Sequence, residues 1–116
     1  MPDRWYAGNA EDERHDYRGW MIGHFIDSEA SPRGTNEVEV KWGNHTAGEA
    51  RDEWTVGEQR TTLLILINGK FRLDLPDESV HLTRQGDYVI WGPGLEHSWQ
   101  AETDAVVITV RWPSIS

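Results

Sequence analysis

The chain has 116 residues, the length of a single domain, with 11 basic and 20 acidic residues and a formal net charge of −9. This acidic balance argues against partners with phosphate backbones or anionic membrane surfaces, because both demand a basic face. The absence of cysteine excludes disulfides, thiolate metal sites and cysteine nucleophiles.

The first third of the chain contains a polar segment followed by two predicted strands. Residues 1–18 are polar and aperiodic, and we expect an N-terminal arm that is loosely ordered or lies against a partner. Residues 20–26, WMIGHFI, predict a strand, and residues 37–42 alternate in polarity as a half-buried strand does. In the second strand, one face carries Val38, Val40 and Trp42, and the other carries Glu39 and Lys41.

The remainder of the chain predicts a series of short strands. The apolar run 61–67 ends at Asn68-Gly69, a strong hairpin signal, and the alternating run 70–75 is the expected return strand. Further strands are expected at 80–83, 87–91, 97–101 and 105–112. Turn signals every 8–12 residues are typical of an all-β sandwich or barrel. We therefore expect a β-barrel over residues 19–113, followed by a tail at 114–116.

The sequence lacks signals for a membrane or a secreted location. Its longest aliphatic run, Leu63–Ile67, is much shorter than the roughly 20 residues of a membrane-spanning helix. The polar N-terminal segment contains no apolar stretch of the kind found in signal peptides. We therefore expect a cytoplasmic protein that contacts no membrane.

Residues 86–97, GDYVIWGPGLEH, resemble the second motif of the cupin superfamily, with Gly86, Gly94 and His97 at the motif positions. Gly69 matches the glycine that ends the first cupin motif, and the spacing to Gly86 is similar to that of small microbial cupins. The resemblance implies a single-domain cupin, which is an antiparallel jelly-roll β-barrel open at one end, and it implies a homodimer.

The first cupin motif is degenerate in this chain. Thr62 stands at the position of the family's glutamate, and neither of the family's two histidine positions holds histidine. Cupin metal sites combine several histidines with one carboxylate, a set that suits iron, manganese, nickel or zinc. Only His97 remains, with Glu58 as a candidate second ligand, so the resemblance implies at most a weakly held divalent metal.

Several side chains are candidates for a ligand site in the barrel mouth. His97 is expected to act in acid–base chemistry or as a ligand, with Glu58 as the polar group beside it. The candidate ligand-binding residues are Trp54, Trp91, Trp99, Arg51, Arg111 and His45. Arg111 would bind a substrate carboxylate if its strand face lines the barrel, and would be a solvated charge if it faces outward.

Three functions are compatible with these residues. The first is an enzyme of isomerase, cyclase, lyase or oxygenase type, acting on a small, partly apolar molecule in the mouth. The second is a non-catalytic sensor or binding module with the same pocket. The third is a vestigial barrel that serves in assembly. Aromatic residues of the arm, Trp5, Tyr6 and Tyr17, fit an exchange between the two protomers of a dimer.

Overall fold

The computed structural model describes residues 5–26 and 31–115. Within these residues the protein is an all-β structure with one short 3-10 turn, as the alternating sequence predicts. The elements are η1 (Asp16–Gly19), β1 (Trp20–Ile22), β2 (Glu39–His45), β3 (Thr61–Asn68), β4 (Phe71–Asp74), β5 (Ser79–Leu82), β6 (Tyr88–Trp91), β7 (Ser98–Ala101) and β8 (Ala105–Trp112).

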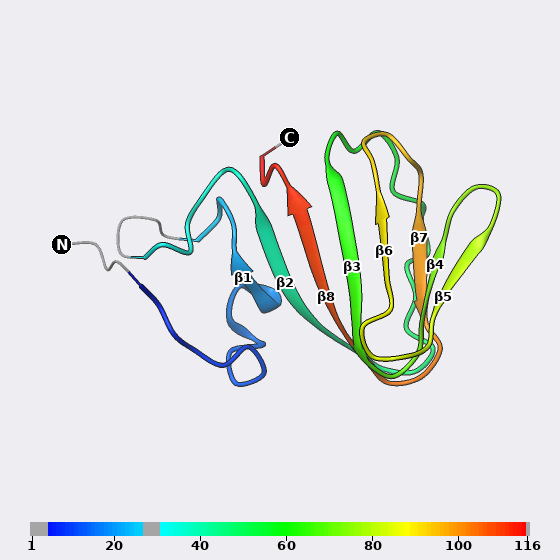
Figure 1. Ribbon diagram of the computed structural model, residues 1–116, viewed down its shortest axis with the longest axis horizontal. Coiled ribbons are helices and arrows are strands. Elements are labelled where there is room, and N and C mark those ends of the chain that lie inside the picture. Colours follow the sequence, from blue (N-terminus) through cyan, green and yellow to red (C-terminus); the bar gives the residue numbers. More distant parts are fainter. Residues whose placement is uncertain (1–4, 27–30, 116) are drawn as a thin grey trace.

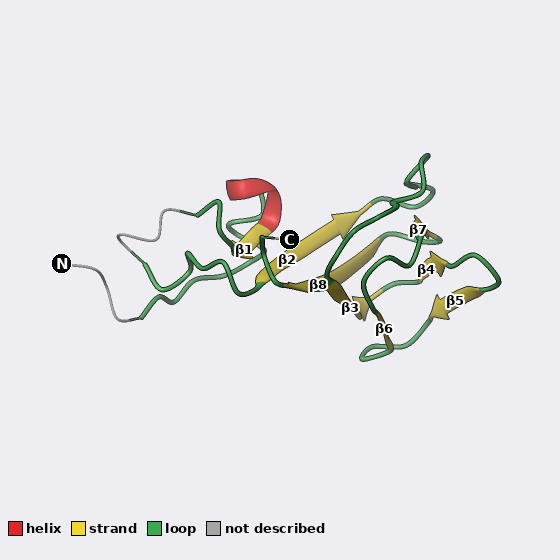
Figure 2. Ribbon diagram, turned by 90° about the horizontal axis from the view of Figure 1, so that it is seen from above, coloured by secondary structure: helices red, strands yellow, loops and turns green. Residues whose placement is uncertain are grey.

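The strands form two antiparallel sheets. The larger sheet has the order β1-β2-β8-β3-β6, and the smaller has the order β5-β4-β7. Figure 1 shows the larger sheet in the middle of the molecule, with the smaller sheet beyond β6. Figure 2, turned by 90°, shows the N-terminal segment extending away from the strands on the side of β1. The last strand, β8, lies between β2 and β3 in the larger sheet, so strands remote in sequence are neighbours.

The hydrophobic core lies between the two sheets. Alternate residues of β3, Leu64 and Leu66, point inward and meet Phe71 and Leu73 of β4 and Val107 of β8. Phe71 is 2% exposed and Leu66 is fully buried. Burial of such side chains stabilises the fold by roughly 1.5–3 kcal/mol each.

The two faces of β2 are reversed relative to the expected amphipathic pattern. Glu39 is buried, and Lys41 and Gly43 line the interior, whereas Val40 and Trp42 lie on the outer face. The register explains this arrangement, because Lys41 pairs with Thr109 and Val40 pairs with Val110 on β8. The interior of this barrel therefore accepts charged side chains.

The Asn68-Gly69 turn does not form the predicted hairpin. Strand β3 pairs with β6 and β8, whereas β4 pairs with β5 and β7, so the turn carries the chain from one sheet to the other. Gly69 has a positive φ of 86°, and a Cβ there would collide with the backbone of Asp104 and Ala105. Glycine is therefore needed at this position because the chain passes close to the backbone of Asp104 and Ala105, and not because the turn is a two-residue hairpin. The chain reverses within the smaller sheet only at the next turn, where β4 and β5 pair with each other.

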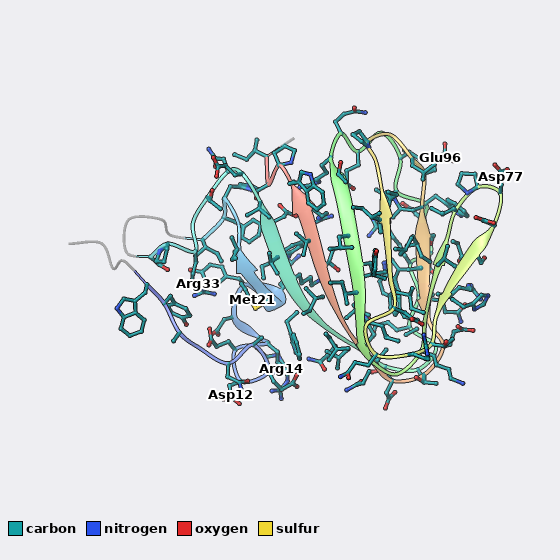
Figure 3. The ribbon with its side chains drawn as sticks, viewed as in Figure 1. Asp12, Arg14, Met21, Arg33, Asp77 and Glu96 are labelled. Carbon is teal, nitrogen blue, oxygen red and sulfur yellow. The ribbon has the colours of Figure 1, made fainter. Side chains whose placement is uncertain are left out.

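The first predicted strand is shorter than expected. Strand β1 ends at Ile22, and the chain turns at Gly23, where the amide of Ile26 donates to the carbonyl oxygen of Gly23. The guanidinium of Arg33 donates to the carbonyl oxygen of Met21 at 2.9 Å, next to β1 (Figure 3).

The described part of the N-terminal arm packs on its own chain. The indole nitrogen of Trp42 and the side-chain Nδ2 of Asn44 donate to the Glu11 carboxylate at 2.8 and 3.1 Å. These bonds anchor the arm to the outer face of β2. Residues 1–4 of the predicted arm lie outside the described residues. No helix in the described residues is long and apolar enough to cross a membrane.

Candidate functional site

A cavity of about 230 Å³ lies between the two sheets. It brings together seven of the side chains predicted for the site, which are His45, Arg51, Glu58, Trp91, His97, Trp99 and Arg111. Trp20, Lys41, Thr62 and Phe71 also line it. The cavity is near the lower end of the size range of ligand pockets, so any ligand is small.

One predicted wall residue, Trp54, does not line this cavity. Its side chain is 44% exposed on the loop between β2 and β3. The next residue, Thr55, pairs with His97, and their amides donate to each other's carbonyl oxygens at 2.8 and 3.2 Å. Thr55 faces the cavity, and alternation along the extended backbone turns Trp54 away from it.

The glycine-rich turn places His97 in the cavity wall. Gly94 has a positive φ of 81°, and its amide donates to the carbonyl oxygen of Glu58 at 2.7 Å, which ties this turn to the loop before β3. The His97 side chain is buried, with its Nδ1 at 3.2 Å from the carbonyl oxygen of Leu95 and its ring 4.7 Å from the Trp91 ring. Burial lowers the pKa of His97 below its ordinary value, so the imidazole is neutral at pH 7.

The predicted partner of His97, Glu58, is held by arginines. Its Oε1 accepts from Arg60 Nε at 2.7 Å and lies 3.4 Å from a terminal nitrogen of Arg111. Arg111 faces inward, which answers the question that its strand position left open. Glu58 is therefore neutralised by two guanidinium groups.

A buried carboxylate, which the sequence analysis did not identify, completes this network. Glu39 is 2% exposed, and its oxygens accept from Arg111 at 2.7 Å and from the Ser114 hydroxyl at 2.9 Å. Arg60 lies 3.1 Å from the same carboxylate. Two arginines and two glutamates thus balance in charge. The alternation of charged and apolar residues along β2 was the available signal, but it does not tell which face is inside.

The side chains of the cavity do not fit a cupin-type metal centre. Among residues 5–26 and 31–115, no group of three or more histidine, aspartate or glutamate side chains is placed to hold a metal ion. Glu58 is occupied by two arginines, and Thr62, at the family's glutamate position, offers only a hydroxyl. Cations on the same walls would repel a divalent ion. The expected metal role of His97 and Glu58 therefore finds no support in this arrangement.

Two further cations line the cavity outside the balanced network. Lys41 comes from β2 in the larger sheet, and Arg51 comes from the loop that runs beside β7, with its amide donating to the carbonyl oxygen of Trp99 at 3.0 Å. Within the described part of the chain, neither side chain has a carboxylate within 4.0 Å. The cavity therefore has a positive excess in a chain of net charge −9.

A larger depression, of about 360 Å³, lies between the N-terminal segment and β1. Its polar groups already have partners, since the Tyr6 hydroxyl donates to Glu13 at 2.7 Å and the Arg33 guanidinium stacks 4.5 Å from the Tyr6 ring centre. The cavity between the sheets is the better candidate, because its charged groups are not all paired.

The fold was compared with known protein families, curated proteins and solved structures. No protein-family model and no curated protein match the sequence. Solved structures do match: KdgF from Halomonas sp. is 21% identical with a TM-score of 0.61, covering 68% of this chain and 72% of that one. A cupin superfamily protein from Desulfitobacterium hafniense is 13% identical with a TM-score of 0.62, covering 71% of each chain.

A conserved protein with a double-stranded β-helix domain from Klebsiella pneumoniae is 20% identical, with a TM-score of 0.60 and coverage of 69% of this chain and 70% of that one. In this chain the motif residues Gly86, Gly94 and His97 flank β6. The described residues therefore have the double-stranded β-helix fold of the cupin superfamily.

Proposed function

We propose that the cavity between the sheets binds a small organic carboxylate. The observation that carries this proposal is the positive excess at Lys41, on β2 of the larger sheet, and Arg51, on the loop beside β7 of the smaller sheet. An arginine guanidinium binds a carboxylate with two parallel hydrogen bonds, which gives both affinity and orientation. The acidic chain as a whole repels anions, so selective binding depends on these local cations.

The carbon skeleton of such a ligand would contact aromatic side chains. Phe71 and Trp99 stack with ring centres 5.3 Å apart, and the His45 ring lies 4.7 Å from Trp99. Trp91 and Trp20 line other parts of the same wall. Aromatic walls with a few polar anchors are typical of sites for partly apolar small molecules.

Acid–base chemistry on the bound carboxylate is the form of activity that the cavity supports best. His97 is neutral at pH 7 because burial lowers its pKa, so its free ring nitrogen can accept a proton from a ligand. Because Glu58 is already paired with Arg60 and Arg111, His97 is the better general base of the two. This favours an enzyme over a passive binding module or a vestigial barrel, and turnover of a bound carboxylate is the discriminating observation.

Carboxylate binding is expected to quench or shift the tryptophan fluorescence of the protein. The probes are acetate, pyruvate, succinate, benzoate and phenylpyruvate, each compared with its uncharged amide. At least one acid is expected to bind at millimolar concentration or below, and its amide to bind roughly tenfold or more weakly, because a hydrogen bond to a charged group contributes about 1.5–3 kcal/mol. The Arg51→Gln variant is expected to lose affinity by a similar factor.

The matched control for this titration is Arg84→Gln, which removes an exposed arginine from the loop between β5 and β6, outside the cavity. Its affinities are expected to equal those of the wild type. Absence of binding by all five acids, or equal binding of acids and amides, would show that the cavity is not a carboxylate site.

We also propose that the protein is a homodimer that pairs the outer faces of its larger sheets. Two cross-strand rows on this face are wholly apolar. One row joins Val40, Val110, Leu63 and Ile90, and the other joins Trp42, Ile108, Ile65 and Tyr88. Tyr88 and Ile90 are 65% and 51% exposed in the single chain. A contiguous apolar face supports association with an identical face through a twofold axis.

Replacing Ile90 with lysine is expected to convert the dimer to monomer. A charge buried within an apolar interface raises the dissociation constant by roughly tenfold or more, while an exposed position tolerates lysine in the monomer. Size-exclusion chromatography with light scattering measures the change. Val56→Lys is the matched control, since Val56 is 63% exposed on the loop between β2 and β3 and belongs to neither apolar row. A monomeric wild type would overturn the proposal.

A further inference from the structure

A second depression, of about 270 Å³, adjoins the cavity between the sheets. It lies where the N-terminal segment faces β2, and it shares Lys41, Gly43 and His45 with the wall of the cavity. Its ionisable lining residues are Arg14, His15, Arg18, Lys41, His45 and Glu49. Basic side chains therefore outnumber acidic ones at this place, although the chain has a net charge of −9.

Two cations of the depression lack a carboxylate partner. The acid among its lining residues, Glu49, is engaged by His45, whose Nδ1 lies 2.9 Å from the carboxylate. As far as the structure describes the chain, neither Arg18 nor Lys41 has a carboxylate oxygen within 4.0 Å. The Arg18 side chain is also exposed, so a ligand in solution has access to it. Both positive charges are thus available to an anion.

The backbone holds Arg18 beside the strand that carries Lys41. Arg18 comes two residues before Trp20, and Trp20 is the residue of β1 that pairs with Lys41. Between them, Gly19 lies so close to β2 that a Cβ on it would collide with the carbonyl oxygen of Trp42. The turn is therefore packed on β2, and both cations reach the depression from neighbouring, paired elements.

Two features of this turn are unfavourable in the protein alone. Tyr17 and Arg18 have φ values of 47° and 56°, in the left-handed region that residues with a Cβ rarely adopt. Burial is the largest cause that lowers the pKa of Lys41, and the charges of Arg111 and Arg18 lower it further. The Glu49 charge opposes them, but the net direction is downward. Backbone strain that brings like charges together is typical of a ligand site, because an anion relieves the repulsion.

We propose that Arg18 and Lys41 bind a phosphate group in this depression, either as inorganic phosphate or as the phosphate monoester of a small molecule. Such a monoester carries about −1.5 to −2 charges at pH 7, which matches two cations. Its oxygens accept hydrogen bonds from a guanidinium and an ammonium group at once. The volume of the depression leaves room for a short organic group beside the phosphate.

This site goes beyond the proposed carboxylate site. Lys41 belongs to the walls of both, but Arg18 does not line the cavity between the sheets, and Arg51 does not line the depression. The two proposals therefore have different probes and different arginines, so each can fail while the other holds.

A phosphorus NMR titration of the full-length protein at low ionic strength tests the phosphate site, with inorganic phosphate and glycerol 1-phosphate as the probes. At least one probe is expected to bind at millimolar concentration or below. Sulfate is expected to compete, whereas glycerol is not. Sodium chloride is expected to weaken binding, because it screens the two cations. Tighter binding of the ester would identify an organic phosphate as the ligand, and the reverse order would identify the free ion.

Two substitutions remove the proposed anchors one at a time. Arg18→Gln and Lys41→Gln are each expected to weaken phosphate binding by roughly tenfold or more, because each removes a hydrogen bond between charged groups. Lys70→Gln is the matched control for Lys41, since it changes the other lysine of the chain, which lines neither the cavity nor the depression. Arg84→Gln serves in the same way for Arg18. Both controls are expected to bind as the wild type does.

Arg18→Gly separates ligand binding from a structural role of the arginine. Glycine adopts the left-handed conformation without steric cost, so this variant is expected to be at least as stable as the wild type in urea while losing phosphate affinity. Lower stability would show that the arginine serves the fold and would contradict the proposal. Failure of both probes to bind the wild type, or unchanged affinity in Arg18→Gln, would overturn it. Equal losses in Lys70→Gln and Lys41→Gln would do the same, because they would show general attraction and no site.

Discussion

Replacing Glu39 with alanine is expected to lower the free energy of unfolding by about 3–5 kcal/mol. Glu39 is 2% exposed and is the shared acceptor for Arg60, Arg111 and Ser114. Its removal leaves the two guanidinium groups with Glu58 as their one remaining shared carboxylate, so an unbalanced positive charge adds to the loss of the hydrogen bonds. Equilibrium unfolding in urea, followed by tryptophan fluorescence, measures the change.

The comparison for Glu39 is Glu49→Ala, which removes a carboxylate whose side chain is 45% exposed and which pairs with His45. Surface pairs of this kind contribute about 0–1 kcal/mol, so this variant is expected to unfold close to the wild type. Glu39→Gln keeps an acceptor oxygen but not the charge, so its free energy of unfolding is expected to lie between those of Glu39→Ala and Glu49→Ala. Equal stability of Glu39→Ala and wild type would show that the arginines find other partners.

Replacing Phe71 with alanine is expected to cost about 3–5 kcal/mol of stability, because it removes a ring from the middle of the core and leaves a cavity. Phe71 is 2% exposed and stacks on Trp99, with ring centres 5.3 Å apart. The same ring forms part of the floor of the ligand cavity, so the variant is also expected to bind carboxylates more weakly. Urea unfolding and the fluorescence titration measure these two effects separately.

The chain offers a matched control in Phe25, its other phenylalanine, which is 38% exposed and contacts Trp20 at its ring edge. Phe25→Ala is expected to cost clearly less than Phe71→Ala, since a half-exposed ring buries less apolar area. Phe71→Leu, which keeps much of the volume, is expected to recover a large part of the stability. A loss as large for Phe25→Ala as for Phe71→Ala would contradict this account of the core.

The strands with strong alternation were predictable from the sequence, and so was the position of the second motif. Strands β3 and β8 match their predicted ranges closely, because each is a nearly continuous run of apolar, mostly β-branched or leucine residues. The loop from Gly86 to His97 could be identified because glycine spacing and a histidine repeat the pattern of the cupin fold. A glycine in a tight turn is required by the backbone conformation at that one position, so its spacing in the sequence is enough to predict the turn.

Features that depend on which strands pair could not be predicted. The alternation of β2 indicates two different faces, but the pairing of Lys41 with Thr109 and of Val40 with Val110 decides which face is inside. Charged residues are rarely buried without a partner, so the sequence predicts that Glu39 and Lys41 face the solvent. Likewise, Asn68-Gly69 predicts a hairpin, because nothing in the residues around this turn indicates that the next strand joins the other sheet.

The central place of β8 has a consequence for folding. Strand β8 forms the partner of both β2 and β3, so the larger sheet is continuous only after Ala105–Trp112 has been synthesised and docked. Pairing β2 with β8 closes a loop that contains most of the barrel, and closure over such a sequence distance slows folding. Arg111 also enters with this strand. A nascent chain therefore has no binding cavity until its last strand is in place, and a ligand can stabilise only the finished barrel.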